Sequence, residues 1–403
     1  MSELMNSEAV RRLEGYFARV GQVLGRRERR ESFAIYAMGL LGDGERKSME
    51  PIASRACADP TQADAAHQRL LRFAKDSPWS DRDVRREAAA YGIAALTARE
   101  DINAWIVDDT GFIKQGSHSV GVQRQYTGSA GKITNCQIGV SLSVATPTEH
   151  LPLDFELYLP QSWTEKPDRR REARIPDELT FKTKPELALE MITRAVADGV
   201  PKGVVLGDSA YGSSIDFRTG VRALGLHYAV GVDPKTSVWR IEQEWNRGES
   251  LSVRELALQL RYRRCTWRKG TKVDLTAKFA LTRVLPAHDG GLPANMRESL
   301  WLLVEWRDGD KEPANYFLCS LPERTTKKQL IRIVMQRWRT ERLYEDLKNE
   351  LGLDHFEGRR FLGWHHHISV ALCCYTFIVA ERVQRFPPSA PRSVADDAQP
   401  LSP

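Results

Sequence analysis

The sequence predicts a mixed α/β protein, and three observations support this expectation. Apolar residues recur at three- and four-residue spacings within residues 1–95, as they do in amphipathic helices. Short apolar runs alternate with helical patterns over residues 102–232, which is typical of a parallel or mixed sheet. Residues 236–322 contain successive strand patterns, and two helical patterns follow as far as residue 383. We therefore expect helices at the N-terminus, a sheet-based core and a β-rich segment inserted into that core.

Composition narrows the class of protein. The chain has 403 residues, enough for two or three domains, and its 41% hydrophobic and 28% charged residues are typical of a soluble globular protein. This composition excludes a disordered chain, a coiled-coil rod and a disulfide-stapled mini-protein. Lys and Arg number 59 against 53 Asp and Glu, so the formal net charge is +6. A polyanionic partner is permitted by this charge but not indicated by it.

Cysteine spacing and hydropathy indicate in which compartment of the cell the protein resides. The six cysteines form no C-x-x-C pair, so neither a zinc ribbon nor a thioredoxin-like motif is predicted. Cys373 and Cys374 stand in an apolar run and are expected in the core. The N-terminus lacks the apolar stretch of a signal peptide, and the longest apolar run, residues 370–380, is too short to span a bilayer. The sequence thus predicts a cytoplasmic protein without membrane contact.

The first region, residues 1–95, is predicted to be an N-terminal helical domain. Leu13, Phe17 and Val20 share one stripe of its first helix. Arginines follow within positions 26–30, where they either bind phosphates or form a solvated helix face. The sequence leaves both interpretations open, so DNA binding by this domain is an expectation only.

The second region, residues 100–235, is predicted to be the first part of a sheet-based core. Its expected strands are 105–107, 136–144, 152–159, 203–207 and 227–232, with a helix over 185–197. The strand at 105–107 is expected to end at Asp108, and the strand at 203–207 at Asp208.

The third region, residues 236–322, is predicted to be a β-rich insertion, with strands at 261–267, 275–284, 300–306 and 316–320. The core is expected to resume over 323–383 with two helices. One is predicted to run without interruption from Thr326 to Leu351, and the other covers 364–383. Residues 384–403 are rich in proline and are expected to form a disordered tail.

Acidic residues follow two of the predicted strands. Asp108 and Asp109 come after the first strand of the core, and Asp208 comes after a later one. Open α/β sheets place their functional sites at the carboxyl ends of strands, where carboxylates could share a divalent cation. The alternative is that these aspartates only cap turns, which is their commoner role.

The helix predicted over 326–351 adds a third acid. Its apolar stripe, which includes Val334 and Trp338, continues onto Glu341, Tyr344 and Lys348. Burying an unpaired carboxylate is costly, so we expect Glu341 to be paired or metal-bound. A salt-bridged surface helix is an equally good interpretation, because Arg337–Glu341 and Glu341–Glu345 are both i,i+4 pairs.

These residues resemble those of the DDE transposases of bacterial insertion sequences. One large group of that family carries its third acid in a helical signature of Y, two residues, R, three residues, E, six residues and K. Arg337, Glu341 and Lys348 match this signature, and Tyr344 supplies an aromatic residue between E and K. Val334 stands where the signature has tyrosine, so the role of that tyrosine does not carry over.

The first two acids of the family also have counterparts here. The family's acidic-D-T segment resembles residues 108–110, which maps the first acid to Asp109 with Asp108 as its acidic neighbour. The family's D-x-x-Y segment resembles Asp208 to Tyr211. Further stretches resemble the seven-oh-one branch of the insertion-sequence-four superfamily: 44–48, 108–112, 121–126, 155–160 and 350–359. The resemblance extends over about residues 10 to 382.

The resemblance implies a ribonuclease-H-like fold and a metal-dependent DNA enzyme. Asp109, Asp208 and Glu341 would be both the catalytic residues and the ligands of two Mg²⁺ ions, or Mn²⁺ in their place. Which of Asp108 and Asp109 is the ligand stays open. The expected partner is double-stranded DNA, both transposon ends and target, held by a dimer in the synaptic complex.

Several basic and aromatic residues are expected to contact DNA. The resemblance points to Arg337, Tyr344 and Lys348. The basic segment 261–272 adds Arg263, Arg264, Arg268 and Lys269, for which a charged, solvated edge strand is the alternative. His365, His366 and His367 are expected on a helix surface or facing DNA, since consecutive helical residues cannot chelate one ion well. Arg124, Tyr126 and Lys132 either line the site or belong to an ordinary loop.

The function predicted from these observations is that of a transposase that cuts the ends of its own element and joins them to target DNA. Two alternatives remain: a metal-dependent nuclease on the same fold without strand transfer, and an inactive relative that only binds DNA. A glycosidase with paired carboxylates is a weak fourth interpretation, because it leaves Arg337 and Lys348 unexplained.

Overall fold

The computed structural model describes residues 7–241, 250–268, 274–287 and 298–385. Its helices are α1 (Ser7–Leu24), α2 (Arg27–Leu41), α3 (Met49–Ala56), α4 (Ala63–Lys75), α5 (Asp81–Thr97), α6 (Gln161–Thr164), α7 (Pro167–Ala173), α8 (Lys184–Ala197), α9 (Ser209–Gly212), α10 (Ile215–Ala223), α11 (Val253–Ala257), α12 (Lys327–Val334), α13 (Trp338–Asn349) and α14 (Phe361–Arg385). Its strands are β1 (Ala104–Ile113), β2 (Gln123–Thr127), β3 (Lys132–Ala145), β4 (His150–Tyr158), β5 (Val204–Gly207), β6 (Tyr228–Gly231), β7 (Ser237–Arg240), β8 (Leu251–Ser252), β9 (Arg263–Arg268), β10 (Leu275–Pro286), β11 (Leu300–Trp306) and β12 (Asn315–Cys319). The mixed α/β class with a helical N-terminus is therefore confirmed.

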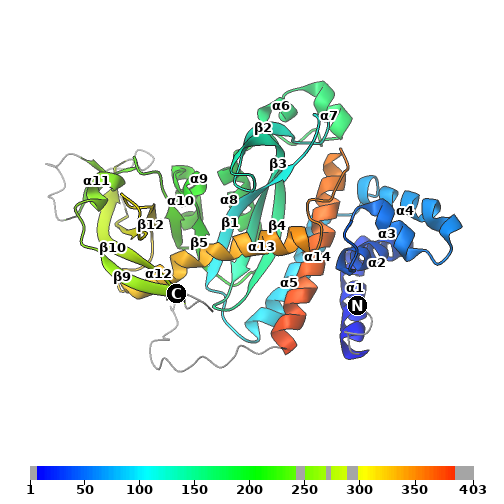
Figure 1. The fold of residues 1–403 in the computed structure, drawn as a ribbon, viewed down its shortest axis with the longest axis horizontal. Coiled ribbons are helices and arrows are strands. Elements are labelled where there is room, and N and C mark those ends of the chain that lie inside the picture. Colours follow the sequence, from blue (N-terminus) through cyan, green and yellow to red (C-terminus); the bar gives the residue numbers. More distant parts are fainter. Residues whose placement is uncertain (1–6, 242–249, 269–273, 288–297, 386–403) are drawn as a thin grey trace.

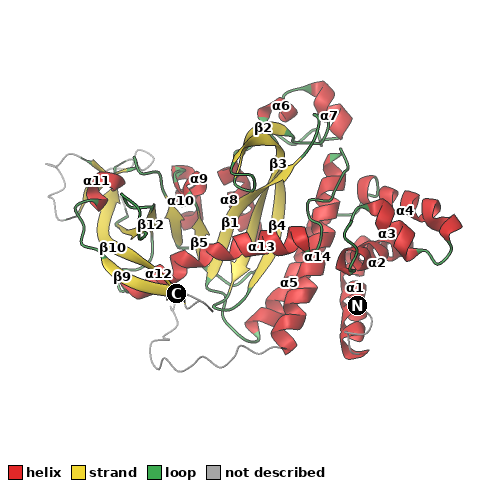
Figure 2. Cartoon of the chain, viewed as in Figure 1, coloured by secondary structure: helices red, strands yellow, loops and turns green. Residues whose placement is uncertain are grey.

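One sheet contains all of these strands, as Figure 2 shows. The main order is β2-β3-β1-β5-β6-β12-β11-β10-β7-β8, with β4 paired to β3 and β9 paired to β10. The parallel pairs β1–β5 and β5–β6 form its centre. Strand β12 continues the sheet by pairing antiparallel with β6, from Phe317↔Gly231 to Cys319↔Ala229. The β-rich residues 236–322 thus extend the central sheet, and the domain boundaries expected from the sequence stay predictions.

Helix α14 joins the N-terminal helices to the sheet (Figure 1). It packs against α5 and β4, and also against α2 and α4. Two polar links close this contact: Arg12 Nε lies 2.6 Å from Glu381 Oε1, and the Tyr16 hydroxyl donates to the Cys373 carbonyl at 3.0 Å. Cys373 and Cys374 are buried, as expected. The helices of 1–95 therefore share their core with residues from the far end of the described chain.

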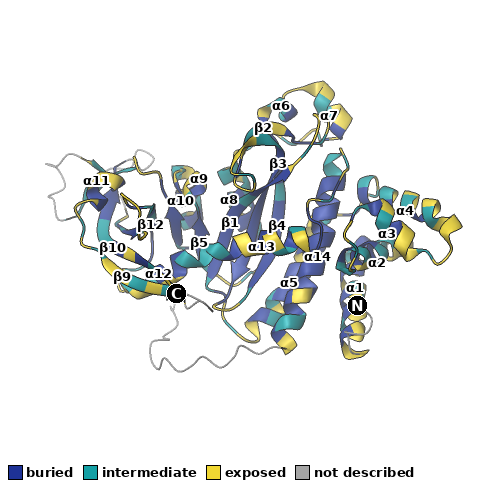
Figure 3. Ribbon diagram, in the orientation of Figure 1, coloured by how far each residue is buried: buried dark blue, intermediate teal, exposed yellow. Residues whose placement is uncertain are grey.

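The structure differs from the predictions made for α12, α13 and α14. The single helix predicted from Thr326 to Leu351 is wrong, because a 3-10 turn at Met335–Arg337 separates α12 from α13. The surface position predicted for His365, His366 and His367 is also wrong. All three residues are buried, since α14 is surrounded by other elements over most of its length, as its dark colour in Figure 3 shows. The disordered tail predicted over 384–403 is wrong for Gln384 and Arg385, which belong to α14, and residues 386–403 lie outside the described residues.

Strand β1 also differs from its expected length. The sequence pattern ended it at Asp108, but β1 continues to Ile113 by pairing with β3. Its parallel pairing with β5 stops earlier, at Ile106↔Leu206. Asp108 therefore lies inside a strand, one residue pair beyond the point where β5 ends at Gly207. This departure of β5 leaves one edge of β1 free of a neighbouring strand beside the acids.

Candidate active site

The pleat of β1 separates the two neighbouring aspartates, because successive strand residues point to opposite faces of a sheet. Asp108 pairs across the sheet with Ser141 of β3, and it accepts a hydrogen bond from Arg337 Nη1 at 2.8 Å. Asp109 points to the other face, where Lys184 Nζ of α8 donates to its Oδ2 at 3.0 Å. The two aspartates thus belong to different environments.

Helix α13 covers the face that carries Asp108, and Figure 1 shows it crossing the sheet. Tyr344 and Ser141 share a hydrogen bond of 2.6 Å between their hydroxyl groups. Lys348 Nζ donates to Thr110 Oγ1 and to the Gly111 carbonyl, both at 2.8 Å. Together with the Arg337–Asp108 pair, just before α13 begins, these contacts fix both ends of α13 against β1 and β3.

Asp208 reaches the same neighbourhood from the end of β5. It caps the short helix α9, and its Oδ1 accepts from the Ala210 amide at 2.9 Å. The charge of Asp208 raises the pKa of Asp108, which requires the two carboxylates to be near each other. The turn-capping role considered from the sequence is therefore present, and the charge of the capping residue also acts on Asp108.

Glu341 is not on a buried face of α13, where the sequence pattern placed it as a paired or metal-bound residue. Its side chain is exposed on α13, and it makes no hydrogen bond or ion pair with the other residues that the structure describes. Its charge nevertheless acts on Arg337. Burial lowers the pKa of this arginine, but Asp108, Asp208 and Glu341 outweigh that effect and raise it. One guanidinium is thus shared electrostatically by three carboxylates.

Asp108 is the most perturbed acid of this group. Only 9% of the residue is exposed, and burial raises the pKa of its carboxyl to about 7. Arg337 opposes this shift, whereas Asp208 and Asp109 reinforce it. The carboxyl pocket is short of positive charge, and an additional cation there would stabilise the ionised form.

The tyrosine and lysine expected to contact DNA have internal partners here. Tyr344 is buried and bonded to Ser141, so its described role is to hold α13 on the sheet. Lys348 is partly exposed while bound to Thr110 and Gly111. Arg337 is about one third exposed beside Asp108. DNA contact by these residues stays a prediction, and for Tyr344 the burial speaks against it.

The basic strand β9 approaches the start of α13. Arg263, Arg264 and Arg268 are all exposed, as expected, and Arg264 pairs with Asp308 at 2.8 Å. The guanidinium of Arg268 lies over the ring of Trp338, 3.6 Å from its centroid. Trp338 is the first residue of α13, so this contact links the basic strand to the helix that carries Glu341. Lys269 lies outside the described residues.

Lys184 is a residue of the site that sequence patterns do not indicate. This residue begins α8 behind a capping box formed by Thr183 and Glu186, which is recognisable as a helix start. Its contact with Asp109 spans 75 positions of the chain, and no local spacing signals it. The Tyr211 hydroxyl also donates to Asp109, at 3.4 Å, so the D-x-x-Y tyrosine serves Asp109 rather than Asp208.

The acids of the α13 face have the donor chemistry that a divalent metal ion requires. Within the described ranges, no three His, Cys, Asp or Glu side chains form a ready-made metal cluster. The donors on the α13 face are nevertheless all carboxylate oxygens, which suit Mg²⁺, and the raised pKa of Asp108 marks a demand for positive charge. The residues therefore fit a hard cation in their chemistry.

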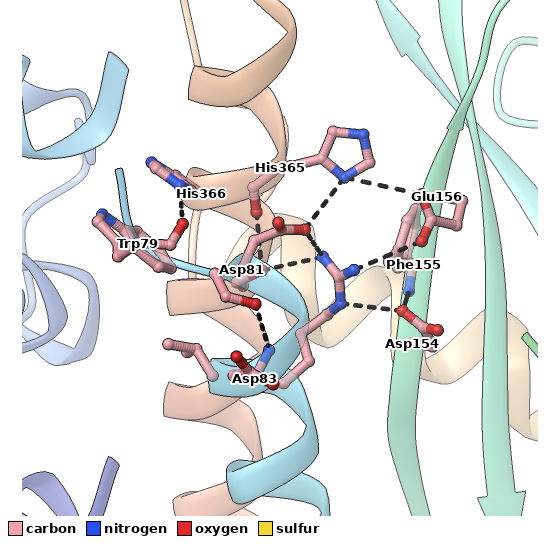
Figure 4. Close-up of polar contacts among 12 residues, drawn as sticks. Trp79, Asp81, Asp83, Asp154, Phe155, Glu156, His365 and His366 are labelled. Atoms are coloured by element: carbon pink, nitrogen blue, oxygen red, sulfur yellow. Dashed lines mark hydrogen bonds and ion pairs between the residues drawn. The ribbon is translucent and has the colours of Figure 1, made fainter. Parts of the chain in front are cut away.

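A second group of charged residues is buried between α5, α8, α14 and β4. Arg85 lies 2.7 Å from Asp81 and 2.9 Å from Asp154, and Arg194 lies 2.7 Å from Glu156. Figure 4 shows Asp81, Asp154 and Glu156 pointing toward one another, with His365 beside them. We call Asp81, Arg85, Asp154, Glu156, Arg194 and His365 the closed cluster, because each of its acids has an arginine partner.

Comparison with known proteins defines the class. Residues 19–273, more than half of the chain, match the family described as DDE superfamily endonuclease. Residues 183–377 match the family described as transposase DDE domain. The chain belongs to the DDE superfamily of endonucleases, and its mixed sheet with a helical N-terminus agrees with the ribonuclease-H-like fold expected for that family.

A curated relative gives a narrower comparison. The chain is similar to the probable transposase for insertion sequence element IS701 of Microchaete diplosiphon, with 30% identity over 203 residues. The match covers 50% of this chain and 48% of the relative, so it spans about half the length of each. Among the described helices, none is both long and apolar enough to cross a membrane.

Proposed function

We propose that this protein is a transposase that cleaves the ends of an insertion sequence and joins them to target DNA. The observation that carries the proposal is the position of Arg337, which donates to Asp108 at 2.8 Å and whose pKa the charges of Asp208 and Glu341 also raise. Both matched families and the similar transposase support the same class of reaction. The two DNA substrates and a dimer on paired ends are part of this proposal.

The proposal assigns divalent metal binding to Asp108, Asp208 and Glu341. Two Mg²⁺ ions, or Mn²⁺, would supply Lewis-acid chemistry for displacement at a DNA phosphate. Similarity of motifs mapped the first acid to Asp109. The pleat supports Asp108 instead, because Asp108 shares the α13 face and Asp109 is already paired with Lys184.

Arg337 and Lys348 have distinct parts in this proposal. The Arg337 guanidinium would turn from Asp108 to a phosphate of the bound DNA, since it is partly exposed and presents several donors. Lys348 would keep α13 in register with β1 through Thr110 and Gly111. The hydroxyl nucleophiles of such reactions are water and the DNA 3′ end, so no serine or tyrosine of the chain is needed.

The test uses the full chain and DNA that carries the ends of its own element. Glu341→Gln is expected to abolish metal-dependent cleavage while leaving binding of the ends intact. The matched control is Glu345→Gln, another exposed glutamate of α13, which pairs only with Arg342 at 3.7 Å among its described neighbours. Cleavage by the Glu341 variant at the wild-type rate contradicts the proposal.

A second assay separates strand transfer from cleavage alone. Pre-cut ends are offered with a supercoiled target plasmid, and joined products are counted. Joining by the wild type supports a transposase, whereas cleavage without joining supports the nuclease. End binding with neither reaction supports an inactive relative.

A further inference from the structure

The β2–β3 hairpin, residues 123–135, displays an unusual amount of apolar surface. Tyr126 is 63% exposed and Ile133 is 60% exposed, and the two residues are directly opposite each other in the register. Ile113, at the end of the adjoining strand β1, is 60% exposed as well. These are the three most exposed large hydrophobic residues of the described chain. Ile113 lies on the opposite face of the sheet from the other two, because its register partner Cys136 is three residues from Ile133 on β3. The exposed apolar pair is therefore Tyr126 and Ile133, and adjacent exposed apolar residues mark an interaction surface more often than singly scattered ones do.

The tip of this hairpin is fixed beside the candidate active site. The Ser129 hydroxyl accepts from the Gly111 amide at 3.2 Å and lies 3.1 Å from Thr110 Oγ1. Lys348 Nζ of α13 donates to the same hydroxyl at 3.2 Å. Thr110 is two residues beyond Asp108 on β1, so one serine ties the turn both to the strand of the first acid and to the helix of the third.

The charges around the pair indicate the kind of partner. Arg124 and Lys132 are both exposed, and neither forms an ion pair with an acid of the described residues. Arg124 shares a face of β2 with Tyr126, because they are two positions apart on one strand. An aromatic ring next to unpaired basic groups is the combination that stacks on a base and contacts its phosphate.

We propose that Tyr126 and Ile133 form a stacking surface for a DNA base next to the cleaved bond, with Arg124 at the adjoining phosphate. This inference rests on the proposed function, since it needs DNA at the α13 face. An unpaired or easily unpaired base fits the surface best, because stacking on a side chain requires a base to leave its neighbours in the duplex.

The experiment replaces single bases near the cut with 2-aminopurine, whose fluorescence rises when the base leaves its stack in the duplex and changes again on contact with a tyrosine ring. Full-length Tyr126→Ala is expected to bind end DNA with an unpaired terminal base about tenfold more weakly, as stacking contributes roughly 1–3 kcal/mol per base. Tyr126→Phe is expected to restore binding and fluorescence, because the ring carries the effect. Ile133→Ala should show a smaller loss in the same direction.

Leu258→Ala is the control, because Leu258 is also exposed, at 53%, but lies after α11. Wild-type affinity and fluorescence in Tyr126→Ala overturn the inference. So does unchanged DNA binding with an altered oligomeric state in light scattering, which makes the hairpin a protein contact. A fluorescence change that depends on Tyr126 in the Glu341→Gln variant separates this inference from the proposed function, since that variant is not expected to cleave.

Discussion

The two acidic groups of this protein are built in opposite ways. In the closed cluster, Asp81, Asp154 and Glu156 are matched by Arg85 and Arg194, and Arg85 is only 3% exposed. On the α13 face, three carboxylates share the single guanidinium of Arg337, and Glu341 is exposed to solvent. Every carboxylate of the closed cluster has an arginine within ion-pair distance, whereas on the α13 face only Asp108 has one among the described residues.

The contrast between the two groups separates acids that stabilise the fold from acids that bind a ligand. Buried carboxylates that serve the fold need nearby cations of the chain, because an unpaired charge in the interior is costly. Carboxylates that serve a ligand must keep part of their demand for cations unmet. The exposure of Glu341, which has no ion-pair partner among the described residues, is the sign of that unmet demand. A raised pKa alone does not separate the two groups, because burial also raises the pKa of Glu156 in the closed cluster to about 7.

The largest expected effect tests which aspartate belongs to the open group. Asp108→Asn should reduce DNA cleavage by at least roughly a thousandfold, as expected when a residue of a cooperating set is removed. Asp109→Asn should leave measurable cleavage, because Asp109 faces Lys184 on the other side of the sheet. Cleavage rates of both variants, compared on the same end DNA, decide between them. If Asp109→Asn loses more cleavage activity than Asp108→Asn, Asp109 is the first acid of the site.

The second prediction concerns the stability of the fold when the closed cluster loses an arginine. Arg85→Ala should lower the free energy of unfolding by about 3–5 kcal/mol, because it leaves buried carboxylates without a partner. Arg86→Ala is the matched control on the same helix, since that side chain is 51% exposed and pairs with Asp83 at 3.3 Å. Urea unfolding of both variants provides the measurement. Equal stability of the two would show that the cluster does not hold the helices to the sheet.

The closed cluster also predicts how the stability of the protein depends on pH. Burial lowers the pKa of His365 to about 4, although Asp81 acts in the opposite direction. In the unfolded chain a histidine binds its proton near pH 6.5, well before buried His365 does in the folded protein. The free energy of unfolding is therefore at its full value above pH 6.5 and decreases as the pH falls from 6.5 toward 4. The variant His365→Leu should show a decrease in the free energy of unfolding between neutral and acidic pH that is smaller by on the order of 2–3 kcal/mol. Urea unfolding at pH 7 and pH 4.5 measures it, and an unchanged slope would exclude His365 as the cause.

The smallest expected effect concerns the open group. Arg337→Gln should strengthen Mn²⁺ binding by up to about tenfold, because the guanidinium and the metal compete for Asp108. Electron paramagnetic resonance of free Mn²⁺ measures this affinity without DNA. Arg342→Gln is the control, because Arg342 pairs with Asp346 at 2.9 Å on the outer side of the same helix. Weaker binding by the Arg337 variant would mean that this arginine supports the metal site.

Much of this organisation could be predicted from the sequence, because it depends on local pattern. The periodicity of residues 1–95, the strands before Asp108 and Asp208, and the order of the acids are all local signals. The arrangement of residues across the sheet could not be predicted. Whether Asp108 or Asp109 faces α13 depends on the pleat of a strand whose length was itself misjudged.

Long-range packing explains the remaining differences. Three histidines in a row suggested a surface, yet His366 stacks on Trp79 and His367 bonds to the Tyr36 hydroxyl at 2.6 Å. Those partners lie hundreds of positions away, so no window of sequence reveals them. The break between α12 and α13 contains no proline or glycine that would signal it, and its Arg337 bonds to Asp108, 229 positions away in the chain.

The position of α14 has a consequence for how the protein is made. The helices of residues 7–97 bury their apolar faces against α14, which the ribosome synthesises more than 260 residues later. A nascent chain therefore cannot complete its N-terminal core until residue 385 has left the exit tunnel. Until then the apolar surface stays exposed, so slow or interrupted translation should yield an aggregation-prone intermediate rather than a partly active fragment.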